Sequence, residues 1–178
     1  MLFRSLYGPI VIHETESLAP EMDADRIWVL DDIRVDEDGS ISEHGTSHPD
    51  QMHGRHGNLA LINGSSEISV TEMAPGAVER WRLVNSANAR TLTLRFPGLE
   101  VREIGADGGL WPQKWTRDVE EIVLPVGARA ELEVRLAEGA ESGGMDLVIL
   151  TFDENDDVVE MGLEMVSVEV NLKGKDNQ

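Results

Sequence analysis

Short runs of β-branched and apolar residues, separated by turn dipeptides, restrict the fold of this chain more than any other feature. The run RTLTLRF at residues 90–96 alternates polar and apolar side chains, as a strand with one buried face requires. Turn pairs such as Asn63-Gly64 and Pro97-Gly98 interrupt the runs, because asparagine and glycine tolerate tight turns. About ten such runs, without a convincing amphipathic helix, predict an all-β Greek-key sandwich or barrel.

Length and charge limit the number of domains and the class of partner. A chain of 178 residues, 40% of them hydrophobic, is long enough for one well-packed domain and too short for two ordinary ones. We therefore expect a single domain over residues 1–178, with a frayed tail at 173–178. Asp and Glu number 34 against 15 Lys and Arg, which gives a net charge of −19. Since this charge repels phosphate groups, neither nucleic acid nor an anionic membrane is an expected partner.

The chain contains no cysteine, which excludes disulfides, thiolate zinc sites and cysteine-ligated copper within it. No segment approaches the roughly 18 apolar residues that a membrane-spanning helix needs. The first residues of the given sequence lack the apolar stretch of a signal peptide. We therefore expect a soluble chain, with no sequence signal for a particular location.

Four of the five histidines gather in one segment of the chain, residues 44–58: His44, His48, His53 and His56. Imidazole suits copper, zinc and nickel, but the spacing of these histidines matches no tight ligand pattern. We expect an extended, exposed polar loop and no native metal site. A metal site formed by the four histidines is the alternative.

The remaining polar motifs predict no catalytic residue. No serine stands in a G-x-S-x-G elbow, and Asp31 and Asp32 are neighbours on a strand and face opposite ways. The acidic segment 153–164 resembles a calcium loop but has Val158 where the sharp turn needs glycine, so a hairpin turn is expected there.

The tryptophans fall into two groups. Trp81 lies inside a strand-like run and is expected in the core, whereas Trp111 and Trp115 flank Pro112 in a loop. Aromatic side chains in such a loop pack against the protein or form a stacking platform for sugars. A carbohydrate-binding module is therefore a further alternative.

Six phrases occur in one order along residues 5–136: SLYGPIVI (5–12), DRIWVLDDI (25–33), GRHGNLALING (54–64), APGAVERWRLVNSANARTLTLRF (74–96), EIGADGGLWP (103–112) and IVLPVGARAELEVRL (122–136). Together they resemble the second cupredoxin domain of the three-domain multicopper oxidases, the laccase and bacterial copper-oxidase family. The resemblance implies a cupredoxin-like fold for residues 5–136, completed by closing strands within 137–172.

Members of that family oxidise phenols, aromatic amines or metal ions at one copper and reduce dioxygen to water at a copper cluster. Their copper ligands come from His-x-His pairs and a His-Cys-His segment in the first and third domains, and this sequence contains neither pattern. The resemblance therefore implies a middle domain or fragment that binds no copper and is inactive alone, although the parent enzyme uses copper. Its expected partners are the neighbouring copper-bearing domains, which it bridges, and it is expected to line the substrate cleft.

The resemblance also bears on individual residues. Asp32 resembles, by position, the acidic residue that contacts substrate in some laccases; the alternative is an ordinary strand-end aspartate. His53 and His56 fall on the approach to a strand, and His44 and His48 fall in a variable loop, so no copper ligand is expected among them. An isolated domain exposes surface that its neighbours would cover, and we expect it to self-associate. A stand-alone metal-binding or carbohydrate-binding module is the alternative function.

Overall fold

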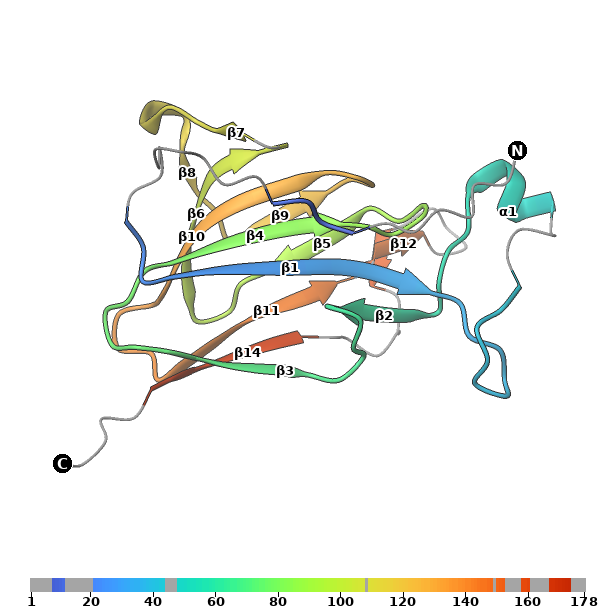
Figure 1. Ribbon diagram of the computed structural model, residues 1–178, viewed down its shortest axis with the longest axis horizontal. Coiled ribbons are helices and arrows are strands. Elements are labelled where there is room, and N and C mark those ends of the chain that lie inside the picture. The colour runs from blue at the N-terminus through green and yellow to red at the C-terminus, as the bar shows by residue number, and fades with distance from the viewer. Residues whose placement is uncertain are drawn as a thin grey trace.

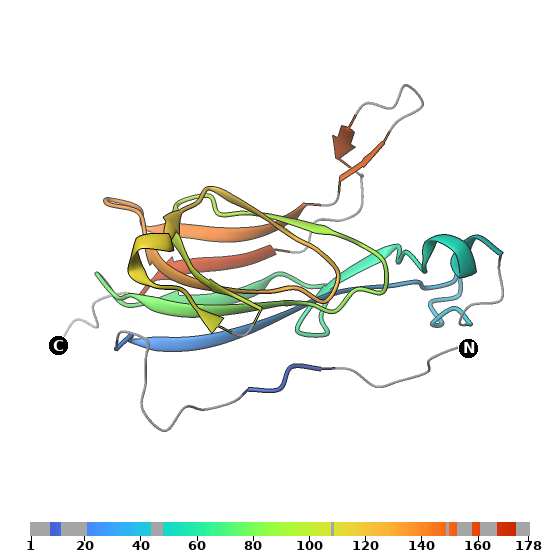
Figure 2. The same ribbon diagram turned by 90° about the horizontal axis from the view of Figure 1, so that it is seen from above.

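Two β-sheets packed face to face form the body of the protein (Figures 1 and 2). The computed structural model describes residues 8–11, 21–43, 48–107, 109–148, 150–152, 158–160 and 167–173. The two sheets are twisted layers with the core between them, which confirms the all-β prediction. Within the described residues, no helix is long and apolar enough to cross a membrane.

The first sheet has the strand order β2-β1-β4-β10-β6-β7, with β8 paired to β6. Strands β1 and β4 run parallel, and the other pairs in this sheet are antiparallel. The bounds are β1 Ala24–Ile33, β2 Leu59–Ile62, β4 Glu79–Asn85, β6 Leu99–Ala106, β7 Gly109–Leu110, β8 Arg117–Asp118 and β10 Arg129–Leu136.

The second sheet has the order β3-β14-β11-β5-β9. Its strands are β3 Ser69–Met73, β5 Leu92–Arg95, β9 Glu121–Leu124, β11 Ser142–Val148 and β14 Ser167–Leu172. A separate pair, β12 Leu150–Phe152 and β13 Val158–Glu160, is antiparallel, as a hairpin requires. In the described residues, two short helices lie outside the sheets: α1 at His48–His53 and the 3-10 helix η1 at Gln113–Trp115.

The period-two pattern predicts the core side of most strands correctly. Leu92, Leu94 and Phe96 are buried, as expected for residues 90–96. Thr93 differs, because it is buried on the opposite face, where its cross-strand neighbour Val148 is buried as well. This end of the outer face is therefore closed to solvent.

Trp81 lies at the centre of the core and is fully buried, as its strand position predicts. Its ring meets that of Trp28 edge to face, with the centroids 5.5 Å apart. Trp81 Nε1 donates a hydrogen bond of 2.9 Å to the buried carboxylate of Glu79. Arg26 donates to both oxygens of the same carboxylate, at 2.6 and 2.8 Å. The indole N–H of Trp81 is thus joined to the ion pair of Arg26 and Glu79, which supplies the buried carboxylate with hydrogen-bond donors.

Candidate functional site

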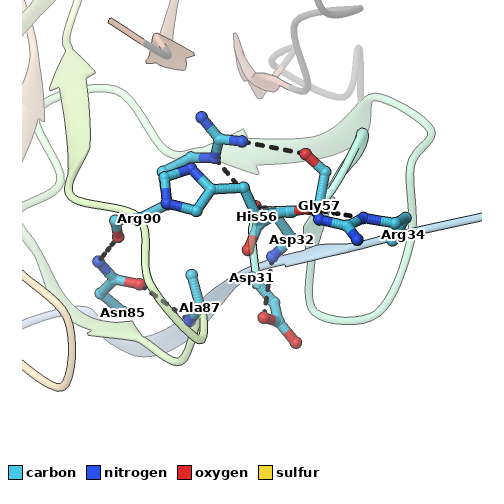
Figure 3. A network of polar contacts seen from close by, with 8 residues as sticks. All are labelled: Asp31, Asp32, Arg34, His56, Gly57, Asn85, Ala87 and Arg90. Atoms are coloured by element: carbon cyan, nitrogen blue, oxygen red, sulfur yellow. Dashed lines mark hydrogen bonds and ion pairs between the residues drawn. The ribbon is translucent and has the colours of Figure 1, made fainter. Parts of the chain in front are cut away.

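The polar contacts that fix one end of the sandwich meet at Asp32, near the carboxyl end of β1 (Figure 3). The Asp32 carboxylate is fully buried, and Arg90 is almost as inaccessible. Asp32 Oδ2 accepts hydrogen bonds from Arg90 Nε at 2.9 Å and from the Gly57 N–H at 2.6 Å. Arg90 Nη2 closes the triangle by donating to the Gly57 carbonyl oxygen at 3.0 Å. We call Asp32, Gly57 and Arg90 the Asp32 cluster.

The turn that carries Arg90 is held by the side chain of Asn85, the last residue of β4. Asn85 Nδ2 donates to the carbonyl oxygens of Arg90 at 2.9 Å and of Leu124 at 2.8 Å. Its Oδ1 accepts the N–H of Ala87 at 3.0 Å. Because this buried amide uses its donors and its acceptor, it sets the path of the chain from β4 to β5.

Arg34 joins α1 to the same end of β1. Its Nη1 and Nη2 bind the two carboxylate oxygens of Asp50 at 3.0 and 3.1 Å, in the forked geometry that favours arginine. Nε and Nη2 also donate to the carbonyl oxygen of His56 at 3.1 and 2.9 Å. The helix α1 replaces part of the extended loop predicted for this segment. The local sequence pattern does not predict this helix, because the contact that holds it joins Asp50 to Arg34, 16 residues away along the chain.

Gly57 permits the close approach of the segment 54–58 to β1. A Cβ atom at Gly57 would lie 2.6 Å from both the nitrogen and the carbonyl oxygen of Ile33. At Gly54, where φ is +82°, a Cβ atom would lie 2.5 Å from the Cβ of Ala89. Both glycines are therefore required by contact with backbone or a neighbouring short side chain, and the second also by its backbone conformation.

Substitution of Gly57 by alanine is expected to destabilise the protein by about 1–3 kcal/mol, because the new methyl group pushes the segment away from β1. The matched control is Gly109→Ala, since a Cβ there meets nothing within 4 Å and φ is not in the left-handed region. Urea unfolding followed by circular dichroism measures both variants. An equal, small loss of stability in Gly57→Ala and Gly109→Ala would contradict the close contact between Gly57 and Ile33.

The Asp32 cluster has the properties of a clamp. Among the described residues, Asp32 Oδ1 is buried and has no hydrogen-bond partner. Asp31, its neighbour, is half-buried on the other face of the strand, as predicted, and accepts the N–H of Asp32 at 2.8 Å. The Asp32 carboxylate, the group in the cluster that could act as a nucleophile, is buried and bound to Arg90 and to the Gly57 N–H. The geometry therefore positions chain segments and does not expose a reactive group.

The predicted site residues are placed as follows. Asp32 is in the cluster, enclosed by Gly57 and Arg90. His48 is exposed on α1, and His56 is exposed beside the cluster. His44 lies outside the described residues, and only the backbone of His53 is described. No group of three or more histidine, aspartate or glutamate side chains that could hold a metal occurs in the described part of the chain. The four-histidine alternative stays a prediction.

The two tryptophans that flank Pro112, Trp111 and Trp115, differ in their exposure to solvent. Trp111 is half-buried, whereas Trp115 is 61% exposed on η1. Lys114 Nζ lies 5.5 Å from the centroid of the Trp115 ring, within reach of a cation–π contact. The sugar-platform alternative stays a prediction that rests on Trp115.

Arg90 is the partner of Asp32 that the sequence motifs did not indicate. The signal that could have found it is the inward position of Asp32 on β1, since a carboxylate at a core-facing position needs a cation and hydrogen-bond donors. Which of the arginines supplies the cation depends on the fold, because Arg90 is 58 residues from Asp32 along the chain.

No family model and no curated protein sequence matches this chain. Solved structures do match it. A multicopper oxidase from Campylobacter jejuni, described as a metallo-oxidase, is 27% identical, with a TM-score of 0.62 over 86% of this chain. A laccase-like multicopper oxidase, CueO from Ochrobactrum sp., is 26% identical, with a TM-score of 0.60 over 88% of this chain. One from Pseudomonas thermotolerans is 23% identical, with a TM-score of 0.63 over 86%.

The chain spans about a third of the length of these structures, since it covers 31%, 32% and 34% of them in the same order. It therefore matches part of a multicopper oxidase, and its fold is that of a cupredoxin domain. The resemblance to a cupredoxin domain of the multicopper oxidases, inferred from the six sequence phrases, is confirmed.

Proposed function

We propose that this chain, which matches part of a multicopper oxidase, is the copper-free middle domain of a laccase-type enzyme. In this role it bridges two copper-bearing cupredoxin domains and is inactive without them. One observation carries the proposal: the chain matches about a third of the length of multicopper oxidases but contains no cysteine.

The donor atoms of the chain do not fit the copper sites of such enzymes. A blue-copper site takes two histidines and a cysteine, and this chain has no cysteine and no two histidines separated by one residue. In the described ranges, His48 and His56 are exposed and belong to no cluster of potential ligands. The copper chemistry is therefore assigned to the neighbouring domains.

The proposed parent oxidises phenols, aromatic amines or metal ions and reduces dioxygen to water. Two of the matched structures support this substrate range: the Campylobacter enzyme is described as a metallo-oxidase, and the Ochrobactrum enzyme as an oxidase of lignin model compounds. The middle domain contributes surface to the cleft in which such substrates bind.

Asp32 has two possible roles in that cleft. It contacts substrate directly through Oδ1, or it holds the segment 54–58 in place through Gly57. Direct contact requires this segment to open, because the carboxylate is fully buried. The observed hydrogen bonds to Gly57 and Arg90 favour the positioning role.

The isolated chain is expected to bind no stoichiometric copper and to show no oxidase activity. Titration with Cu(II) in the presence of a competing chelator, followed by metal analysis after desalting, measures this. The stand-alone metal-binding alternative predicts instead saturable binding near one copper per chain that is lost in His53→Ala/His56→Ala. Such binding would overturn the copper-free role.

The exposed Trp115 supports the carbohydrate-binding alternative. This alternative predicts sugar-dependent quenching of tryptophan fluorescence that disappears in Trp115→Ala.

The expected self-association of the isolated chain also stays a prediction, supported by exposed apolar side chains such as Ile41, Met52 and Val70.

A further inference from the structure

The segment of residues 8–11 lies apart from both sheets. It crosses in front of the first sheet in Figure 1 and runs outside the outer face of that sheet, beyond β1, in Figure 2. No strand pairing or hydrogen bond joins residues 8–11 to another described residue. Because the hydrogen bonds between strands lie in the plane of a sheet, a segment that crosses over a face does not extend that sheet.

The sequence of this segment nevertheless favours a strand. Pro9 is followed by the run Ile10-Val11-Ile12, and β-branched apolar residues are typical of strands. The comparable runs at residues 68–73 and 90–96 contain β3 and β5. A linker is the plain alternative, but linkers are rich in glycine, serine, proline or charged residues. The run is therefore a strand sequence that the described part of the chain leaves without a sheet.

The exposure of Ile10 is a second observation. Its side chain is 89% exposed, more than that of any other large hydrophobic residue in the described ranges. A single exposed apolar side chain needs no explanation on a protein surface. Here, however, the backbone N–H and carbonyl groups of Ile10 and Val11 also bond to no described residue. A partner with an open sheet edge satisfies these backbone groups and covers the side chain in one step.

Pro9 limits the position that the segment can take in a sheet. Proline has no N–H group to donate, so it occurs in edge strands or as the first residue of a strand. In an edge strand, the N–H groups of successive residues point alternately toward and away from the neighbouring strand. When Pro9 faces away, the N–H of Ile10 faces the neighbour, and the same N–H is bonded when Pro9 is the first residue of the strand. The Ile10 amide is therefore the group whose hydrogen bond reports the pairing.

Charge and chain coverage bear on which sheet receives the segment. A second copy of this chain is a poor partner, because the net charge of −19 on each copy opposes association. The chain matches about a third of the length of multicopper oxidases, so the proposed parent contains further cupredoxin domains beside it. Addition of a strand to an open sheet edge is a common way for one β-structure to bind another.

We propose that residues 8–11 form a strand in a β-sheet of a neighbouring copper-bearing domain, paired to an edge of that sheet through the N–H of Ile10. The side chain of Ile10 packs against that domain, and the chain crosses from one domain to the other at this segment. The inference rests on the proposed middle-domain role and deepens it, since it names the segment that joins the sandwich to its partner. It also separates residues 8–11 from the sandwich itself.

A first test asks whether Ile10 belongs to the sandwich. In the 178-residue chain, Ile10→Ala is expected to change the thermal unfolding temperature by less than about 1 °C, because the side chain is exposed there. The matched control is Ile122→Ala in β9, an edge strand in which Ile122 is buried. This control is expected to lower the unfolding temperature by about 5–15 °C. Comparable losses in the two variants would overturn the proposal, because Ile10 would then be part of this fold.

The decisive test measures amide hydrogen exchange at Ile10 in two samples, the 178-residue chain and the native protein encoded by the complete reading frame. Mass spectrometry with fragmentation that resolves single amides is the readout. In the 178-residue chain, the Ile10 amide is expected to exchange at the rate of an unstructured peptide. In the native protein, it is expected to exchange about 100-fold more slowly or slower still, because a paired amide exchanges only when its strand opens.

The possible failures are distinguishable. Fast exchange of Ile10 in a longer native protein that contains copper would overturn this inference and leave the middle-domain role in place. A native protein of 19.6 kDa would contradict the middle-domain role and remove the partner proposed here, and the intact mass identifies this case. Slow exchange in the 178-residue chain that depends on its concentration would show pairing with a second copy, and would also overturn the inference.

Discussion

Replacing Asp32 with alanine is expected to lower the free energy of unfolding by about 3–5 kcal/mol, since removal of one partner of a buried ion pair is strongly destabilising. The partner here is Arg90, whose guanidinium is almost inaccessible to solvent. The Gly57 N–H loses its acceptor in the same step. The segment 54–58 is therefore expected to detach from β1.

Urea unfolding followed by circular dichroism measures this loss, and Glu37→Gln is the control. Glu37 is exposed, so its neutralisation is expected to change the stability by no more than about 0.5 kcal/mol. The double variant Asp32→Ala/Arg90→Met is expected to recover part of the loss, because it replaces the second charge of the buried pair by an apolar side chain. A loss below about 1 kcal/mol in Asp32→Ala would contradict the clamp role, because a broken buried pair costs more than that.

Replacing Trp81 with alanine is expected to cost about 3–5 kcal/mol, because a large buried side chain leaves a cavity in a close-packed core. Trp81 is fully buried and packs against Trp28 between the two sheets. The substitution also removes the indole N–H that Glu79 accepts. The two effects act in the same direction.

The same substitution at Trp115 is the control, since that ring is largely exposed on η1. Trp115→Ala is expected to change the stability by no more than about 0.5 kcal/mol. Circular dichroism is again the readout, because both variants change the tryptophan fluorescence. Similar losses of unfolding free energy in Trp81→Ala and Trp115→Ala would contradict the central packing role of Trp81 in the core.

The sequence predicts the strands better than their partners. The alternation in residues 90–96 identifies Leu92, Leu94 and Phe96 as core, because a strand buried on one face repeats every two residues. Thr93 escapes this rule, since its burial depends on the neighbouring strand β11. The alternation of polar and apolar residues and the turn residues can be read from a short stretch of sequence. Whether a neighbouring strand buries an outward-facing side chain depends on the whole fold.

The Asp32 cluster shows the same limit at the candidate site. A resemblance places Asp32 near the end of β1, but its partners Gly57 and Arg90 lie 25 and 58 residues away. Only the assembled sheets bring the three together. The sequence also gathers His48 and His56 in one segment, and the structure places both side chains in exposed positions.

The most direct test of the middle-domain account is the intact mass and copper content of the native protein, read together with the complete reading frame that encodes this chain. The account predicts a copper-containing protein about three times the 19.6 kDa of this chain, since the chain covers about a third of its structural matches. Its frame encodes His-x-His pairs before this sequence and a His-Cys-His segment after it. A native protein of 19.6 kDa, encoded by a frame without these motifs, would contradict the account.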